Sequence, residues 1–374
     1  MIGFIADFLI SLKIWNRRRL CNNRIRKVLS SNSEFRKNST FPEKLKRVLI
    51  VDGYQGWGDF LYHLGLIRDI ATKGIRVDVA TVEQSIPRYT TQYVENIFSI
   101  EDDSSIEDCC AEHYDLCIDL TYVNLNAWEK RLKLLRKISC YSVTVGDVTA
   151  HSSFYSEYVD ISTCAHQSER MAKIYNRIFN EGKSRVFPVY CLDEVKKSED
   201  LLSFEKKISP GRRLVYVNAV AQDADRCLSE QQVRALVSLF AEEENIVGVF
   251  NSPFEIDEQQ SVLRLPKLSF DNFALFLREC DAVITTDTSV THLASAFNVP
   301  ALVFFCGNDR DYFPKYAMSD VWAPLSQGSC VYKEDDPRKS KSENYFLLNS
   351  LKDVSEISDG KVKELSRDFL RSLR

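Results

Sequence analysis

The chain has 374 residues, of which 44% are hydrophobic and 27% charged, with only 13 glycines and 10 prolines. This composition is typical of a soluble globular protein and excludes extensive disorder, and no apolar run reaches the roughly 18 residues of a membrane span. The net charge of -4 hides a basic start, because residues 1–50 carry 12 Lys and Arg against 3 acids while the remainder carries 37 against 50. An acidic body argues against nucleic acid as a partner, and the length predicts two domains of about 150–180 residues.

Residues 1–45 form a basic, amphipathic N-terminal segment. Its apolar stretch precedes Arg17-Arg18-Arg19, contains Asp7 and lacks a small-residue cleavage site, which is unlike a signal peptide. Two interpretations stay open: residues 1–27 lie as a helix on an anionic membrane surface, or they pack on the body as an ordinary helix. We expect a cytoplasmic protein, and the first interpretation places it peripherally on the inner face of a bacterial inner membrane.

Strand-like and helix-like stretches alternate from residue 46 to 190, the expected first domain. A β-branched run at 48–52 leads into a loop with three glycines and then an apolar-periodic helix from 60 to about 73. Further strands are predicted at 76–81, 114–120 and 139–145, with a helix at 126–137. Strands that alternate with helices predict a parallel sheet covered on both faces.

The alternation of strand-like and helix-like stretches is interrupted after residue 190 and resumes in the second half. Residues 191–211 are polar, end in Pro210-Gly211 and are the predicted linker. The second domain spans 212–350, with strands at 213–218, 246–250, 282–286 and 301–305 and helices at 230–243, 271–280 and 290–298. Ser229 and Gln232 have the spacing of a capping box. Residues 351–374 form a C-terminal helix, and the fold class is α/β with two doubly wound, Rossmann-like domains.

Residues 281–300 are the most informative segment for function. A buried strand ends at Asp287, and Thr288, Ser289, Val290 and Thr291 then open a helix. In doubly wound sheets ligands lie outside the carboxyl ends of the strands, and the free N–H groups of a helix start suit a phosphate. Asp287 would accept hydrogen bonds from sugar hydroxyls. The alternative is that Asp287 or Thr288 only caps the helix.

This segment resembles the C-terminal signature of glycosyltransferase family 9, the lipopolysaccharide heptosyltransferases. The run D-x-V-I-T-T-D-T-S-x-T-H-L-A-S-A-x-x-x-P matches the family at Asp287, Thr288, His292, Leu293, Ala294, Ala296 and Pro300. It departs at Ser289, where the family commonly has Gly. Such a Ser fits unless φ is positive, and the departure slightly favours a different donor. Strand 46–51 followed by Gly58-Asp59 is similar to the family's N-terminal half, so the resemblance covers roughly residues 46–320.

The resemblance implies a GT-B fold, in which two doubly wound domains face each other and bind the acceptor and the nucleotide-sugar donor respectively. It implies that Asp59, after the acceptor-side loop of Gly56, Trp57 and Gly58, is the general base of an inverting transfer. A carboxylate at a helix start is kept ionised by the helix dipole; the alternative is a helix-terminal acid without a catalytic role. The implied donor is ADP-heptose, and the implied acceptor is a lipopolysaccharide core or other cell-surface glycan.

The loop after strand 213–218 supplies further donor-binding candidates, Asn218 and Arg226. The family has a basic residue in this loop, and a guanidinium binds two phosphate oxygens at once. The alternative is a solvent-facing Arg226 paired with Asp223 or Asp225. Asp223-Ala-Asp225 has the form of a metal-binding DxD, but that motif belongs to another glycosyltransferase fold. We expect His292 to be structural, with its ring hydrogen-bonded within the turn.

Neither a metal nor a cofactor is expected beyond the nucleotide-sugar substrate. None of the 11 cysteines forms a CxxC motif, which indicates a reducing compartment and no structural zinc. Three alternative functions stay open: a GT-B transferase that uses another nucleotide sugar in capsule or O-chain assembly, an epimerase or hydrolase of nucleotide sugars, and a non-catalytic protein that binds them.

Overall fold

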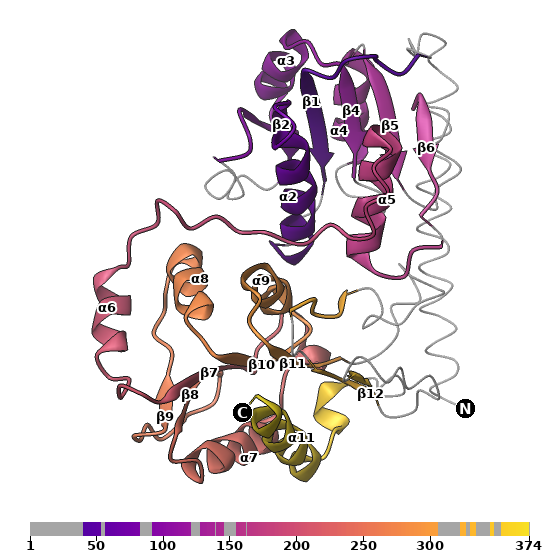
Figure 1. The fold of residues 1–374 in the computed structure, drawn as a ribbon. Helices are drawn as coiled ribbons and strands as arrows, with labels where there is room; N and C mark the ends of the chain where they lie inside the picture. The colour runs from indigo at the N-terminus through magenta and orange to yellow at the C-terminus, as the bar shows by residue number, and fades with distance from the viewer. Residues whose placement is uncertain are drawn as a thin grey trace. The chain divides into compact units, whose positions relative to one another are not determined.

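The computed structural model describes residues 40–53, 57–82, 92–120, 128–138, 140–145, 155–161, 163–305, 322–326, 330–333, 345–347 and 353–373 (Figure 1). The basic residues 1–27, with their two interpretations as a membrane-surface helix or a helix packed on the body, lie outside this part of the chain, as do Gly56 and the side chain of Trp57. No helix within the described ranges has the length and hydropathy to cross a membrane.

The first sheet has six parallel strands in the order β3-β2-β1-β4-β5-β6. The helices of this part of the chain are α2 to α5. The strands are buried on both faces, which explains why β1 and β4 read as continuous apolar runs. The bounds are β1 (Arg47–Asp52), α2 (Trp57–Ala71), β2 (Arg76–Thr81), β3 (Ile97–Ser99), α3 (Asp103–Ala111), β4 (Leu116–Asp119), α4 (Trp128–Lys137), β5 (Tyr141–Val145), β6 (Glu157–Val159) and α5 (Gln167–Phe179).

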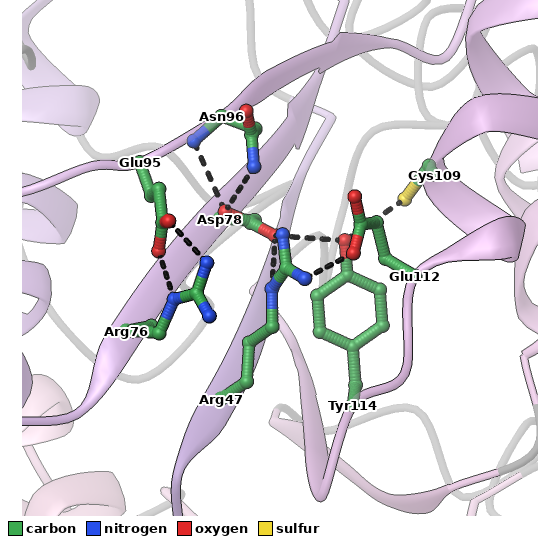
Figure 2. A network of polar contacts seen from close by, with 8 residues as sticks. All are labelled: Arg47, Arg76, Asp78, Glu95, Asn96, Cys109, Glu112 and Tyr114. Carbon is green, nitrogen blue, oxygen red and sulfur yellow. Dashed lines mark hydrogen bonds and ion pairs between the residues drawn. The ribbon is translucent and has the colours of Figure 1, made fainter.

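A buried carboxylate, Asp78 of β2, joins the beginnings of β1 and β2 (Figure 2). It accepts hydrogen bonds from Arg47 Nε at 2.8 Å, from the Tyr114 hydroxyl at 3.0 Å and from Asn96, whose backbone N and Nδ2 lie 3.0 and 3.2 Å away. Arg47 Nη2 also lies 2.7 Å from the same carboxylate. Asp78 is therefore fully hydrogen-bonded, at the strand end opposite the one where ligands bind in such sheets.

The second sheet has seven parallel strands in the order β13-β12-β11-β10-β7-β8-β9. Its core is formed by apolar side chains of β7, β8, β10 and β11 together with α7 and α11. The bounds are α6 (Glu199–Glu205), β7 (Arg213–Asn218), α7 (Glu230–Ala241), β8 (Ile246–Asn251), β9 (Val262–Arg264), α8 (Phe270–Arg278), β10 (Ala282–Thr286), α9 (Ser289–Phe297), β11 (Ala301–Phe304), β12 (Cys330–Lys333), β13 (Tyr345–Leu347) and α11 (Asp359–Ser372).

Both sheets reverse their strand order once. In the first sheet the reversal lies between β1 and β4, and in the second it lies between β7 and β10. Ligands of doubly wound sheets bind outside the carboxyl ends of the strands at this point. In the second sheet those ends are Asn218 and Thr286, so the predicted donor segment, which begins at Asp287, lies at the reversal.

The predicted elements agree with the observed ones to within a few residues, and strands 76–81, 213–218 and 282–286 coincide. The predicted capping box is also present, with both of its hydrogen bonds formed between Ser229 and Gln232. The prediction missed the strands β3, β6, β9, β12 and β13, which have only three or four residues, and the helices α3 and α5. The predicted linker 191–211 contains the short helix α6.

The chain divides into two compact units that do not follow a single boundary. One contains the six-stranded sheet. The other contains the seven-stranded sheet and everything from Arg185 onward, together with residues 56–65 at the start of α2 and residues 165–171 at the start of α5. The predicted base Asp59 and the predicted donor segment therefore belong to the same unit, which was not expected from the sequence.

Candidate functional site

The first turn of α9 is capped by Thr288. Its hydroxyl accepts a hydrogen bond from the backbone N of Val290 at 3.3 Å, and its carbonyl accepts one from Thr291 N at 3.1 Å. Within the described residues these bonds use the N–H groups of Val290 and Thr291 and leave those of Thr288 and Ser289. The expected row of four open N–H groups is thus reduced to two, because the N-cap residue itself satisfies the others.

Ser289, where the family commonly has Gly, occupies an ordinary helical backbone as the first residue of α9. Among the described residues a positive φ outside glycine occurs only at Asn180 and Asn298. The substitution therefore causes no backbone strain. Asn298, with φ 56°, ends α9 in the left-handed conformation that commonly terminates helices.

Two predicted donor-binding residues, Arg226 and Asp287, lie next to each other. Arg226 Nη1 is 3.5 Å from both the Asp287 carboxylate and the Asp287 carbonyl, and Nη2 pairs with Asp223. Burial alone lowers the pKa of Arg226, but the bonds to Asp223 and Asp287 outweigh it and the pKa is raised. Asp287 is buried, whereas the Arg226 side chain is 30% exposed. The ion pair with Asp223, which we gave as the alternative, is thus present, and Arg226 also contacts the predicted donor segment.

Asn218 is buried at the end of β7, and its amide is committed to protein partners. Its Nδ2 donates to the Val220 carbonyl at 2.8 Å, to Thr285 Oγ1 at 3.2 Å and to Thr288 Oγ1 at 3.4 Å. Its Oδ1 accepts a hydrogen bond from Asn251 Nδ2 at 2.9 Å. Asn218 thus joins the carboxyl ends of β7, β8 and β10 to the N-cap of α9, and its role in donor binding stays a prediction.

Helix α2 begins at Trp57, three residues earlier than predicted, and this places Asp59 in its first turn, half-buried. Gly58 lies against α9. A Cβ built on Gly58 would be 3.4 Å from Cα of Ser289 and 2.6 Å from Cδ2 of His292. The turn that carries Asp59 therefore touches the first turn of the predicted donor helix, within one compact unit.

His292 is buried in an aromatic cluster and not hydrogen-bonded within its turn, contrary to our expectation. Its ring centroid lies 5.2 Å from that of Tyr62 and 5.3 Å from that of Trp322. Its Nδ1 has no hydrogen-bond partner among the described residues. Burial, with a contribution from His166, lowers the pKa of His292 to about 3, so the ring is neutral at physiological pH.

His166, a residue to which sequence reasoning assigned no role, precedes the first residue of α5. Its Nδ1 accepts a hydrogen bond from Ser168 N at 3.1 Å, and its own backbone N donates to Glu169 at 3.4 Å, as in a capping box. The remaining ring nitrogen, Nε2, lies 2.9 Å from the carbonyl of Ala323. A carbonyl only accepts, so Nε2 carries the proton.

The sequence analysis missed the cluster around His292, namely Tyr62, His166 and Trp322. Tyr62 had one available signal, since it follows Gly58 by four residues and so lies on the same helix face. Trp322 had none, because its contacts depend on long-range folding. Within the described ranges no group of three or more His, Cys, Asp or Glu residues has the arrangement of a metal site.

Doubly wound parallel sheets with a strand-order reversal are typical of proteins that bind nucleotides at the carboxyl ends of their strands, a class that includes the glycosyltransferases with the GT-B fold. The model of glycosyltransferase family 9 (heptosyltransferase) matches residues 105–341, and the chain belongs to this family. A curated relative, "Putative lipopolysaccharide heptosyltransferase 4" of Escherichia coli K12, is 23% identical over 331 residues, which are 84% of this chain and 89% of the relative.

Two solved structures from E. coli share the GT-B fold. Heptosyltransferase WaaC with ADP has a TM-score of 0.60 at 18% identity, covering 86% of this chain and 99% of that one. ADP-heptose lps heptosyltransferase II has a TM-score of 0.59 at 16% identity, covering 88% and 100%. The chain is thus a heptosyltransferase-like member of a glycosyltransferase family.

Proposed function

We propose that this protein transfers a heptose from ADP-heptose to a hydroxyl of the lipopolysaccharide core or another cell-surface glycan. The family and the names of its relatives support this donor and acceptor class. The observation that carries the proposal is the contact of Gly58 with Ser289, which brings the turn of Asp59 against the first turn of α9. A base for the acceptor and a phosphate-binding helix start are needed side by side in such a transfer.

In the proposed reaction Asp59 accepts the proton of the acceptor hydroxyl while the hydroxyl oxygen attacks the anomeric carbon. The bond from that carbon to the nucleoside diphosphate breaks in the same step, with inversion. Arg226 and the N–H groups of Thr288 and Ser289 stabilise the negative charge that develops on the leaving diphosphate. These fixed positive groups make a metal ion unnecessary for that task. Asp287 accepts hydrogen bonds from the hydroxyls of the transferred sugar.

A different nucleotide sugar was the main alternative, because Ser289 departs from the family's Gly. The helical backbone at Ser289 accommodates a Ser as readily as a Gly, so this departure is also compatible with the family's donor. We therefore retain ADP-heptose as the proposed donor.

Thermal unfolding with a panel of nucleotides and nucleotide sugars tests the donor. We expect ADP and ADP-heptose to raise Tm, because a ligand at 100 times its Kd stabilises the fold by about 2.7 kcal/mol. UDP- and CMP-sugars should leave Tm unchanged. A shift with only UDP- or CMP-sugars would exclude the heptosyl assignment.

Asp59→Asn tests the base. The amide keeps the size of the side chain but does not accept a proton, so kcat should fall by roughly 10²–10⁴-fold, while the Tm shift with ADP-heptose is retained. Retained turnover would remove Asp59 as the base. Donor binding by the wild type without transfer or hydrolysis would instead indicate a non-catalytic binding protein.

A further inference from the structure

We infer that His292 is a positioning residue. Its ring packs against Gly58 in the first turn of α2 and thereby fixes the position of the Asp59 carboxylate. The inference rests on the proposed function, in which Asp59 is the base. It assigns His292 no contact with the donor or the acceptor.

The contact between Gly58 and His292 leaves no room for a side chain at position 58. A Cβ there would lie 2.6 Å from Cδ2 and 3.3 Å from Nε2 of the His292 ring. Position 58 is helical and its φ is not positive, so the backbone itself does not require glycine. Glycine in a helix costs about 1 kcal/mol relative to alanine. We conclude that the close approach of the ring is what requires glycine here.

Aromatic packing and hydrogen bonds hold the His292 ring in place against α2. Tyr62, one helical turn after Gly58, and Trp322 both pack on it, so the ring meets α2 at two successive positions of one face. The segment of Trp322 is itself fixed to α9, because Leu325 N donates to Ser295 Oγ at 2.9 Å. Ser295 Oγ in turn donates to the carbonyl of Thr291 at 2.9 Å.

A purely structural role does not explain why this ring is a histidine. Two buried polar atoms of the cluster, His292 Nδ1 and the Tyr62 hydroxyl, have no partner among the described residues. Each such atom costs about 1–3 kcal/mol, and an apolar ring would avoid that cost. Because the fold retains a destabilising residue beside the proposed base, we attribute it to function. Burial lowers the pKa of His292 to about 3, so the ring is neutral at physiological pH and is not an imidazolium acid; its contact with Gly58 supports positioning as its role.

The test is a double-mutant cycle on the full-length chain with Gly58→Ala, His292→Ala and both changes together. The methyl group of Gly58→Ala pushes the Asp59 turn away from the ring, and a displacement of about 1 Å lowers turnover by roughly 10²-fold. We expect kcat to fall while the KM for ADP-heptose is unchanged. His292→Ala empties the space, so the double variant should recover the kcat of His292→Ala alone.

Two glycine variants serve as matched controls. A Cβ at Gly360, in α11, meets nothing within 4 Å, so Gly360→Ala should keep the wild-type kcat. A Cβ at Gly65 would lie 2.1 Å from the backbone O of Phe187. Any loss caused by Gly65→Ala should therefore not be relieved by His292→Ala.

Additive effects of the two changes on kcat, in an enzyme whose wild type transfers the sugar, would overturn the role of His292 and leave the proposed function standing. The absence of transfer by the wild type with every nucleotide sugar would remove both. If Gly58→Ala does not fold, His292→Phe tests the same contact, since its larger ring pushes on Gly58. We expect lower kcat at unchanged donor KM; wild-type kcat in this variant would also overturn the role.

Discussion

Two regions of the molecule bury polar side chains in opposite ways. At the strand beginnings of the first sheet, Asp78 is buried and accepts hydrogen bonds from Arg47, Asn96 and Tyr114 (Figure 2). At the strand ends of the second sheet and beside α9, three buried atoms lack partners among the described residues: the Tyr62 hydroxyl, Thr286 Oγ1 and His292 Nδ1. The first arrangement is fully hydrogen-bonded within the fold, and the second is not.

The difference follows from which end of a parallel sheet each region occupies. Ligands of doubly wound sheets bind at the carboxyl ends of the strands, so polar groups at the beginnings serve only the fold and are fully paired. Around the carboxyl ends of the second sheet and α9, three buried polar atoms are instead left unsatisfied by the described residues. We therefore expect changes at Asp78 to alter stability and changes near α9 to alter activity.

The largest expected effect is the loss of stability in Asp78→Ala, a change that affects only the first of the two regions. Removing this carboxylate leaves Arg47 with its other partner Glu112, but it deprives Tyr114 and Asn96 of their acceptor. A buried donor left unsatisfied costs about 1–3 kcal/mol, so the two together cost about 2–6 kcal/mol. The free energy of unfolding, measured by urea denaturation, should fall by that amount. The kcat of the molecules that remain folded should be unchanged.

Glu95→Gln is the matched control for this prediction. Glu95 pairs with Arg76 at the same end of β2, but both side chains are largely exposed. Exposed ion pairs contribute little, so unfolding should be unaffected. Equal losses in the two variants would show that burial of the Asp78 network does not decide its contribution.

A smaller effect is expected at Arg226, on the other side of the comparison. Arg226→Ala removes the guanidinium proposed to bind the donor diphosphate, and a charged hydrogen bond contributes about 1.5–3 kcal/mol. The Kd for ADP, measured by calorimetry, should rise roughly 10–100-fold, while Tm without ligand changes little. Asp223→Asn is the control: it removes the carboxylate that pairs with Arg226, so ADP should bind at least as tightly as to the wild type. An unchanged Kd in Arg226→Ala would contradict its role.

The sequence predicted the regular part of the fold well, because strands such as 213–218 and 282–286 and helices such as α7 carry their own periodicity, caps and breakers. It also predicted the segment 287–291 as a helix start at the carboxyl end of a strand. It did not predict which N–H groups stay open there, since Thr288 caps its own helix and this depends on side-chain geometry.

Long-range contacts account for the remaining differences. The hydrogen bonds of the Asn218 amide with Asn251 and Thr285, on neighbouring strands, were not predicted from the sequence. The packing contact between Gly58 and His292 joins positions more than 200 residues apart. Neither residue type nor local spacing encodes such a contact, whereas a periodic pattern encodes a helix.

The last prediction concerns the pH dependence of stability and the buried ring of His292. Burial lowers its pKa to about 3, against 6.5 for an unperturbed histidine. Below pH 6.5 the unfolded chain therefore binds a proton that the folded protein does not bind. The stabilising contribution is complete above pH 6.5, and it is lost by about 1.4 kcal/mol per pH unit as the pH falls toward 3.

His292→Leu isolates this contribution, because every other titrating group is present in both proteins. At pH 7.5 the variant should be at least as stable as the wild type, since the unpartnered Nδ1 is gone. Urea denaturation at pH 7.5, 5.5 and 4.5 should then show the wild type losing stability more steeply, by the slope of one proton. Parallel curves would mean that the ring gains a proton in the folded protein at these pH values. A partner for Nδ1 would then exist, and the region near α9 would be as completely paired as that of Asp78.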